Sequence, residues 1–295
     1  MAKWTRQARK ALVAALSLAS GGALAVDLPP APALPATSGE DFSGWYLRGD
    51  VGAGFQTTPD LGAAAGWTAV QSGLVPPFAV SSFRNTTLSP SASIDAGVGY
   101  ALNAWLRTDA TLEYRFGGRL RSLYTITDPV RSPLLVSDDL SGGVSSIVAL
   151  LNGYLDVGNF WGATPFVGAG VGVADNAASG VLDRGLALTA AGPAVPVGGF
   201  FSNAAKANFA WALMAGLDVD IAPNLKLELG YRYLNLGSIA VGASHCFVGA
   251  PACAAGGGGA VAARSRGALA SNELRIGLVL LVGEPSSAPA AIVAR

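Results

Sequence analysis

Hydrophobic and polar side chains alternate along eight segments of the chain. In residues 105–115, "WLRTDATLEYR", every second residue from Arg107 to Arg115 is polar, and the residues between them are mostly apolar. This period of two is typical of a β-strand whose two faces meet different environments. The other seven segments are residues 44–55, 91–100, 145–157, 164–174, 209–220, 225–233 and 272–282. The pattern predicts eight β-strands, of which 145–157 is the least regular because only Asn152 and Asp156 set its phase.

The connections between these segments are alternately long and short. The four long ones are residues 56–90, 116–143, 175–205 and 237–268. The three short ones are residues 101–104, 158–163 and 221–224. Long extracellular loops and short periplasmic turns are typical of outer-membrane barrels, and ten residues of a strand tilted by about 40° rise about 25 Å, the height of their apolar band. We therefore predict an all-β fold, an eight-stranded antiparallel transmembrane β-barrel with four long extracellular loops and three short periplasmic turns.

The composition supports a membrane environment. Charged residues make up 13% of the chain and hydrophobic residues 51%, with a mean hydropathy of +0.43, whereas soluble domains carry about 25% charged residues. Two alternatives fit less well. Helical spans in 61–83 or 185–205 would be interrupted by Gly and Pro and would not explain the period of two. A soluble exported barrel with its polar face outside should be rich in lysine, but only Lys206 and Lys226 follow residue 25.

The charges in 105–115 decide which face meets lipid. Arg107, Asp109, Glu113 and Arg115 share one face, and exposing them to hydrocarbon would cost on the order of 10 kcal/mol. We therefore expect the apolar faces to meet lipid and the polar faces to line the lumen. Aromatic residues near the segment ends fit the two interfacial girdles: Trp45, Phe55, Tyr100, Trp105, Tyr114, Phe160, Trp161, Tyr231 and Tyr233.

Fifteen charged residues are expected to point into the lumen. Six are basic and nine are acidic: Arg48, Arg107, Arg115, Lys226, Arg232 and Arg275; and Asp50, Asp95, Asp109, Glu113, Asp156, Asp218, Asp220, Glu228 and Glu273. An eight-stranded barrel is just wide enough for side chains to fill it, and unpaired buried charge is costly. We expect a paired lumen charge network that closes the barrel; a charged constriction that selects solutes is the alternative.

The two ends of the chain have different compositions from the segments between them. Residues 1–25 resemble a secretory signal peptide, with four basic residues before an apolar stretch and "ALA" at 23–25 as the cleavage site. A Pro-rich periplasmic linker follows in 26–42, the barrel in 43–283 and a C-terminal tail in 284–295. Cleavage leaves 15 basic and 19 acidic residues, a net charge of −4, which argues against a nucleic-acid partner.

The remaining candidate chemistry is sparse. Export to an oxidising compartment favours a disulfide between Cys246 and Cys253, with two unpaired thiols as the alternative. His245 is the only histidine, so the sequence predicts no metal site, no cofactor and no strand-borne Ser/His pair for lipid hydrolysis. We therefore expect that this protein is not an enzyme.

Several of these segments resemble one known family. "FSGWYLRGDVGAGF" after a "DLPP" linker, "LRTDATLEYR", "ATPFVGAGVGVA", "FAWALMAGLDVDI" and "LKLELGYRYLNLG" are similar to the opacity-type, OmpA-like outer-membrane β-barrel family, in its immunogenic surface-protein and small porin branch. The resemblance covers roughly residues 26–282. It implies a surface antigen in the outer membrane of a Gram-negative cell envelope, with outer-membrane lipid and the barrel assembly machinery as partners and no shared catalytic residues.

The resemblance leaves three functions open. The first is a mainly structural envelope protein that passes at most small solutes. The others are a narrow porin for small hydrophilic solutes, and an adhesin or haemin-type receptor whose loop ligand the sequence does not name. One departure concerns assembly: family members usually end on a strand with a terminal aromatic residue, whereas here "LVLLV" continues into "GEPSSAPAAIVAR".

Overall fold

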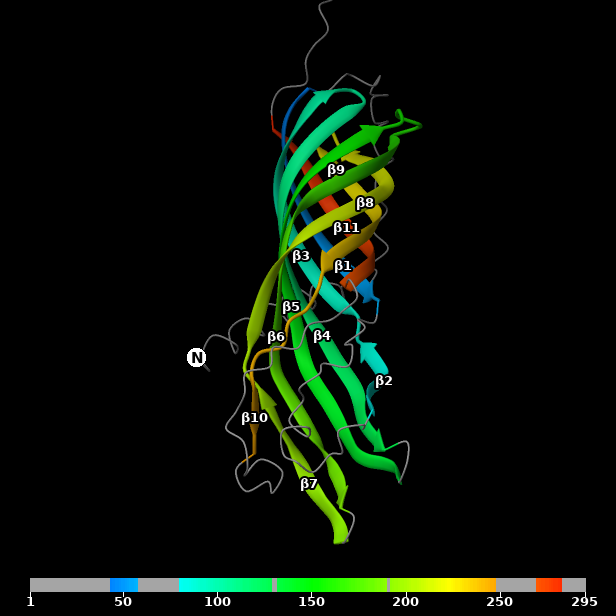
Figure 1. Cartoon of the computed structure of the whole chain (residues 1–295). Coiled ribbons are helices and arrows are strands. Elements are labelled where there is room, and N and C mark those ends of the chain that lie inside the picture. Colours follow the sequence, from blue (N-terminus) through cyan, green and yellow to red (C-terminus); the bar gives the residue numbers. More distant parts are fainter. Residues whose placement is uncertain (1–42, 58–79, 129–131, 190–191, 248–268, 283–295) are drawn as a thin grey trace, which may run out of the picture. The chain divides into compact units, whose positions relative to one another are not determined.

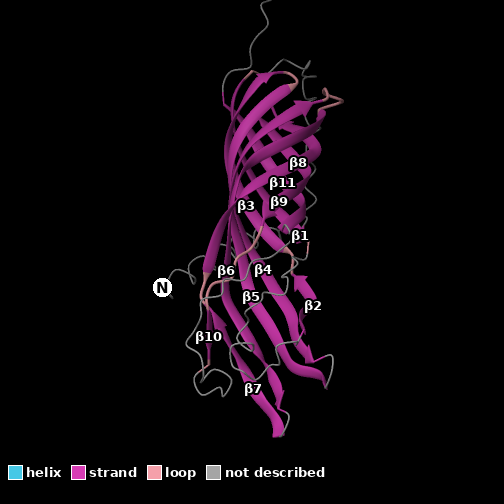
Figure 2. Ribbon diagram, viewed as in Figure 1, coloured by secondary structure: helices cyan, strands magenta, loops and turns pink. Residues whose placement is uncertain are grey.

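The computed structural model describes residues 43–57, 80–128, 132–189, 192–247 and 269–282, which form an all-β fold (Figures 1 and 2). Their eleven strands are β1 Gly44–Gln56, β2 Val80–Leu88, β3 Ser91–Asn103, β4 Leu106–Asp128, β5 Ser132–Asp156, β6 Ala163–Thr189, β7 Gly192–Phe201, β8 Ala204–Ala222, β9 Leu225–Gly237, β10 Ser244–Cys246 and β11 Leu269–Val282. Within these ranges, no helix is long and apolar enough to cross a membrane. The predicted signal peptide, the linker 26–42 and the tail 284–295 lie outside the described residues.

Eight of the strands close into a barrel. Their order around the ring is β6-β5-β4-β3-β1-β11-β9-β8, and pairing of β6 with β8 completes the circle. Every pairing in the ring is antiparallel, including that of the first strand, β1, with the last, β11. The prediction of an eight-stranded antiparallel barrel is confirmed, and each predicted segment lies in one of these eight strands to within one residue at its ends.

The two faces of the barrel wall have the predicted character. In β1, the side chains of Trp45, Leu47 and Val51 are 49–58% exposed on the outside, whereas Arg48 and Asp50 are almost fully buried in the lumen. The same alternation continues in β3 and β11. A soluble barrel with its polar face outside is therefore wrong, because the outer wall is a continuous apolar surface that water would not tolerate.

The predicted long loops contain additional strands, which corrects the sequence-based boundaries. β4 and β5 stay paired as far as Asp128 and Ser132, although 116–143 was expected to be a loop. β6 and β7 form a second hairpin, and β2 and β10 pair with the two edges of this part of the sheet. We call the part formed by β2, β7, β10 and the adjoining ends of β4, β5 and β6 the extension (Figure 1). The reason is visible in "RLRSLYTITD", which keeps the period of two after the glycine pair at 117–118 that interrupts it.

Irregular residues mark the junction between the barrel and the extension. The pairing of β4 with β5 shifts between Arg115 and Gly118, and Gly117 has a φ of 86°. The pairing of β5 with β6 shifts between Ser141 and Gly143, near Gly180, whose φ is 58°. Such β-bulges reverse which side chains point inward beyond them. In β4 the exposed residues are even-numbered from Thr108 to Phe116, whereas Arg119 and Arg121 are exposed beyond the bulge.

Gly117 is expected to be required for its backbone conformation. A Cβ at Gly117 would meet nothing within 4 Å, so Gly117→Ala adds only the strain of a left-handed residue. We expect the free energy of unfolding in urea to fall by about 1–2 kcal/mol. The matched control is Gly153→Ala in β5, where a Cβ also meets nothing within 4 Å and no positive φ occurs. Equal effects of the two substitutions would contradict the prediction.

Candidate functional site in the barrel lumen

Charged side chains line a large part of the lumen. The structure places all fifteen predicted residues on the inner face of the wall: Arg48, Asp50, Asp95, Arg107, Asp109, Glu113, Arg115, Asp156, Asp218, Asp220, Lys226, Glu228, Arg232, Glu273 and Arg275. Twelve are buried. The other three, Asp156, Asp220 and Lys226, are half-buried near the short turns, where Lys226 Nζ lies 3.5 Å from Asp220 Oδ1.

The layer nearest the extension is a ring of alternating charge. Arg115 Nη1 donates to Glu113 Oε1 at 2.8 Å and also pairs with Glu273. Arg232 Nη2 lies 2.5 Å from Glu273 Oε2 and pairs with Glu113 as well. Each guanidinium thus bridges both carboxylates. The two positive and two negative charges sum to zero. Their mutual attraction offsets the cost of removing them from water.

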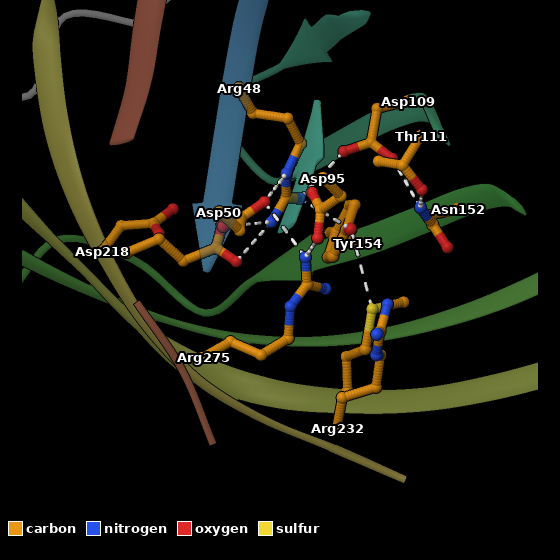
Figure 3. Close-up of polar contacts among 12 residues, drawn as sticks. Arg48, Asp50, Asp95, Asp109, Thr111, Asn152, Tyr154, Asp218, Arg232 and Arg275 are labelled. Carbon is orange, nitrogen blue, oxygen red and sulfur yellow. Dashed lines mark hydrogen bonds and ion pairs between the residues drawn. The ribbon is translucent and has the colours of Figure 1, made fainter. Parts of the chain in front are cut away.

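The middle layer is organised around Arg48 (Figure 3). Its Nε donates to Asp50 Oδ2 at 2.9 Å and its Nη2 to Glu228 Oε1 at 2.6 Å. Its Nη1 donates to Asp109 Oδ2 at 2.9 Å and to the Tyr154 hydroxyl at 2.8 Å. The side chain of Arg48 is completely buried. These contacts join β1 to β4, β5 and β9 through one guanidinium.

Arg275 compensates two carboxylates that face each other. Asp50 and Asp95 are directly opposite across β1 and β3, an arrangement of like charges that destabilises a sheet. Arg275 Nη2 lies 3.1 Å from Asp50 Oδ2 and pairs with Asp95 (Figure 3). The guanidinium from β11 therefore makes this carboxylate pair tolerable.

Arg107 holds the layer nearest the short turns. Its Nε donates to Asp156 Oδ1 at 3.1 Å, its Nη2 lies 2.8 Å from Asp218 Oδ2, and its Nη1 lies 3.7 Å from Glu228 Oε2. Its guanidinium also stacks over the rings of Tyr154 and Phe166, 4.8 and 4.9 Å from their centroids. The aromatic rings remove water from one side of the cation, which strengthens its ion pairs.

Two of these contacts cross the full width of the barrel. β4 and β9 are four strands apart in either direction around the ring. Glu113 of β4 nevertheless pairs with Arg232 of β9, and Arg107 of β4 lies against Glu228 of β9. Because side chains from opposite walls meet at these two levels, the cross-section there is occupied by protein atoms.

Sequence reasoning missed the uncharged polar partners of the network. Tyr46 donates from its hydroxyl to Asp109 Oδ2 at 3.2 Å, and Asn152 Nδ2 donates to Asp109 Oδ1 at 2.7 Å. Ser91 and Ser271 accept from Arg115 Nη2 at 3.1 and 3.0 Å. Tyr46 and Asn152 share strand faces with charged residues, so their phase alone could have identified them. Ser91 and Ser271 lie at the ends of their strands, but they share the phase of Asp95 and Glu273, so the same rule could have identified them.

One side of the lumen is apolar. β5, β6 and β8 contribute buried inward residues such as Val148, Leu150, Ala174, Ala212 and Met214. This explains why 145–157 looks apolar on both faces: its outer face meets lipid, and its inner face packs against small residues of the neighbouring strands.

One Ser/His contact occurs among the described residues, and Ser202 lies outside the strands. Ser202 and His245, which the sequence did not bring together, lie next to each other beyond the barrel, with Ser202 Oγ 2.8 Å from His245 Nε2. The imidazole stacks on Phe200 at 4.9 Å, and no described carboxylate orients its other nitrogen. The predicted disulfide cannot be located, because Cys253 and the side chain of Cys246 lie outside the described residues. No group of three or more His, Cys, Asp or Glu side chains within the described ranges could hold a metal ion.

Comparison with known proteins places this barrel in a family. The model of the outer membrane protein beta-barrel domain matches residues 11–250. The chain belongs to this family. Members of this family lie in the outer membrane of Gram-negative cells. The apolar outer wall of the barrel therefore lies in outer-membrane lipid.

Relatives of this outer-membrane barrel include proteins of Brucella and Rickettsia. An uncharacterized protein of Brucella abortus is 32% identical over 238 residues, which cover 76% of this chain and 78% of the relative. A putative adhesin of Rickettsia prowazekii is 30% identical over 197 residues, covering 65% and 72%. Among solved structures, Neisserial surface protein A aligns over 81% of this chain and 98% of its own at 14% identity, with a TM-score of 0.41.

The central ion pairs are expected to carry much of the barrel's stability. Arg232→Met leaves Glu113 and Glu273 with one shared cation instead of two, so the free energy of unfolding should fall by about 3–5 kcal/mol. The matched control is Lys226→Met, which removes a half-exposed lumenal cation and should cost no more than about 1 kcal/mol. Urea unfolding in lipid vesicles, followed by tryptophan fluorescence, measures both. Similar losses in the two variants would contradict a role for burial.

Proposed function

We propose that this protein is a structural surface barrel of the outer membrane, whose lumen charge network closes it to all but the smallest solutes. The contact that carries this proposal is the pairing of Glu113 with Arg232 across opposite strands of the ring. An open pore needs a continuous column of water, and side chains from facing walls interrupt that column. The role is not enzymatic, and insertion depends on the barrel assembly machinery.

A second layer of contacts supports closure. Arg48 and Arg107 each engage three carboxylates from different strands. Moving either side chain aside would leave several buried charges unpaired, at a cost of several kcal/mol for each. Thermal motion of the guanidinium groups is therefore not expected to open the lumen. A porin differs in this respect, because its constriction stays hydrated.

Planar-bilayer conductance tests the proposal. The purified, refolded protein should show no steady conductance in 1 M KCl, while the change of gel mobility on boiling shows that the barrel is folded. A steady, salt-dependent channel from heat-modifiable protein would contradict closure and favour the narrow porin for small hydrophilic solutes.

Adhesion is the second candidate function, favoured by two observations. The Rickettsia relative is named a putative adhesin, and the hairpins β4–β5 and β6–β7 carry the sheet beyond the barrel. Surface extensions on a rigid scaffold are common sites of recognition. A haemin-type ligand is a further possibility within this class. The Ser202–His245 pair lacks an orienting acid among the described residues, so it gives an enzymatic role no comparable support.

Shortening one hairpin tests adhesion separately from closure. Replacing residues 123–139 with a two-residue turn should leave the heat-modifiable mobility intact. If the extension mediates adhesion, attachment of Escherichia coli displaying the variant to cultured host cells should fall at least fivefold relative to the intact protein at equal surface display. Undiminished attachment would count against adhesion through this hairpin.

A further inference from the structure

Three arginines lie together on the outer face of the sheet, directly beyond its lipid-facing surface. Arg119 and Arg121 follow the exposed aromatic residues Tyr114 and Phe116 along β4. Arg84 lies on the neighbouring strand β2, which pairs with this part of β4 and places Arg84 opposite Leu123. All three side chains are exposed. We call Arg84, Arg119 and Arg121 the arginine cluster.

The bulge at Gly117 is what turns two members of this cluster outward. Without the extra residue, the alternation of β4 would continue, so that Leu120 would face out and Arg119 and Arg121 would face the buried interior. Instead Leu120 and Ser122 are each 2% exposed on the inside. A bulge that re-aims side chains is a specific feature of a strand, and here it sends two cations to the outer surface.

Among the described residues, these cations have no ion-pair partner that would explain their position. No ion pair joins any of the three to a described carboxylate, whereas all fifteen lumenal charges are paired. The acidic residue closest in register on this outer face is Asp139 of β5, which lies opposite Leu123 of β4 and opposite Arg184 of β6. The outer face of this region therefore carries excess positive charge.

The distance of the arginine cluster above the aromatic girdle matches the position of the phosphate layer of a membrane. Aromatic girdles lie at the boundary between hydrocarbon and headgroups, and Tyr114 and Phe116, whose rings stack 5.8 Å apart, belong to the girdle on the extension side. Arg119 and Arg121 lie three and five residues beyond Phe116, which is about 8 and 13 Å higher for a strand tilted by about 40°. Long arginine side chains can reach back several ångströms toward the interface.

We propose that the arginine cluster binds the phosphoryl groups of an outer-leaflet glycolipid. Guanidinium groups bind phosphate through two parallel hydrogen bonds, and the continuous apolar strand below the cluster would hold the acyl chains of the same lipid. The contact fixes the depth of the barrel on the side of β2 and β4. A soluble sulfated polysaccharide would share the anionic chemistry, but it would gain nothing from the girdle directly beneath.

Lipid binding by the full-length refolded protein in nonionic detergent tests this inference. The probes are diphosphoryl lipid A and fully dephosphorylated lipid A with the same acyl chains, titrated and detected by native mass spectrometry. We expect the wild type to bind the phosphorylated form at least about tenfold more tightly. Arg119→Gln with Arg121→Gln should remove most of this preference, and Arg84→Gln on the other strand should reduce it separately.

The matched control is Arg184→Gln, an exposed outward arginine of β6 that lies opposite Asp139. It should keep the wild-type preference, and heat-modifiable mobility verifies that every variant is folded. The proposal is overturned if the wild type binds the two lipids equally or if Arg184→Gln loses as much as the double variant. Cluster-dependent binding of heparin without any preference between the lipids would overturn it in favour of a soluble polyanion.

Discussion

Backbone N–H and C=O groups inside a hydrocarbon layer must bond to one another, because no water is present to take their place. In this protein the constraint is met by a ring of eight antiparallel strands in which the first strand pairs with the last and β6 pairs with β8. No strand edge remains in the membrane-spanning part of the ring. The number of strands then determines the diameter, and the diameter determines which side chains can meet across the lumen.

Crowding inside that narrow ring explains the inward glycines. A Cβ on Gly99 would lie 2.1 Å from Cζ of Tyr46, and a Cβ on Gly277 would lie 1.8 Å from Oδ1 of Asp50. Large polar side chains therefore lie over glycines of the adjacent strand. The lumen accommodates six cations and nine anions only because small and large residues alternate across neighbouring strands. The proposed closure of the pore and the tolerance of buried charge would both follow from the same packing.

The extension follows a different rule from the barrel. Beyond Phe116 the wall is no longer constrained by hydrocarbon, so β-bulges, edge strands and outward charges become acceptable. The shift in register around Gly117 marks the change, because it exchanges the inward and outward faces of β4. A family member can therefore keep one transmembrane architecture while its outer strands and loops differ, which is where relatives named as adhesins would be expected to differ from one another.

The sequence by itself determined the ring of eight strands, their lipid-facing sides and the location of the lumenal charges. A period of two over ten residues indicates a strand, and strands can cross a membrane only as a closed barrel. It could not determine which charges meet, since partners such as Arg48 and Glu228 are 180 residues apart and are brought together only by closure. It also underestimated the strands beyond Phe116, because a bulge breaks the alternation while the backbone pairing continues through it. Only the tertiary structure decided these pairings and the outward direction of Arg119 and Arg121.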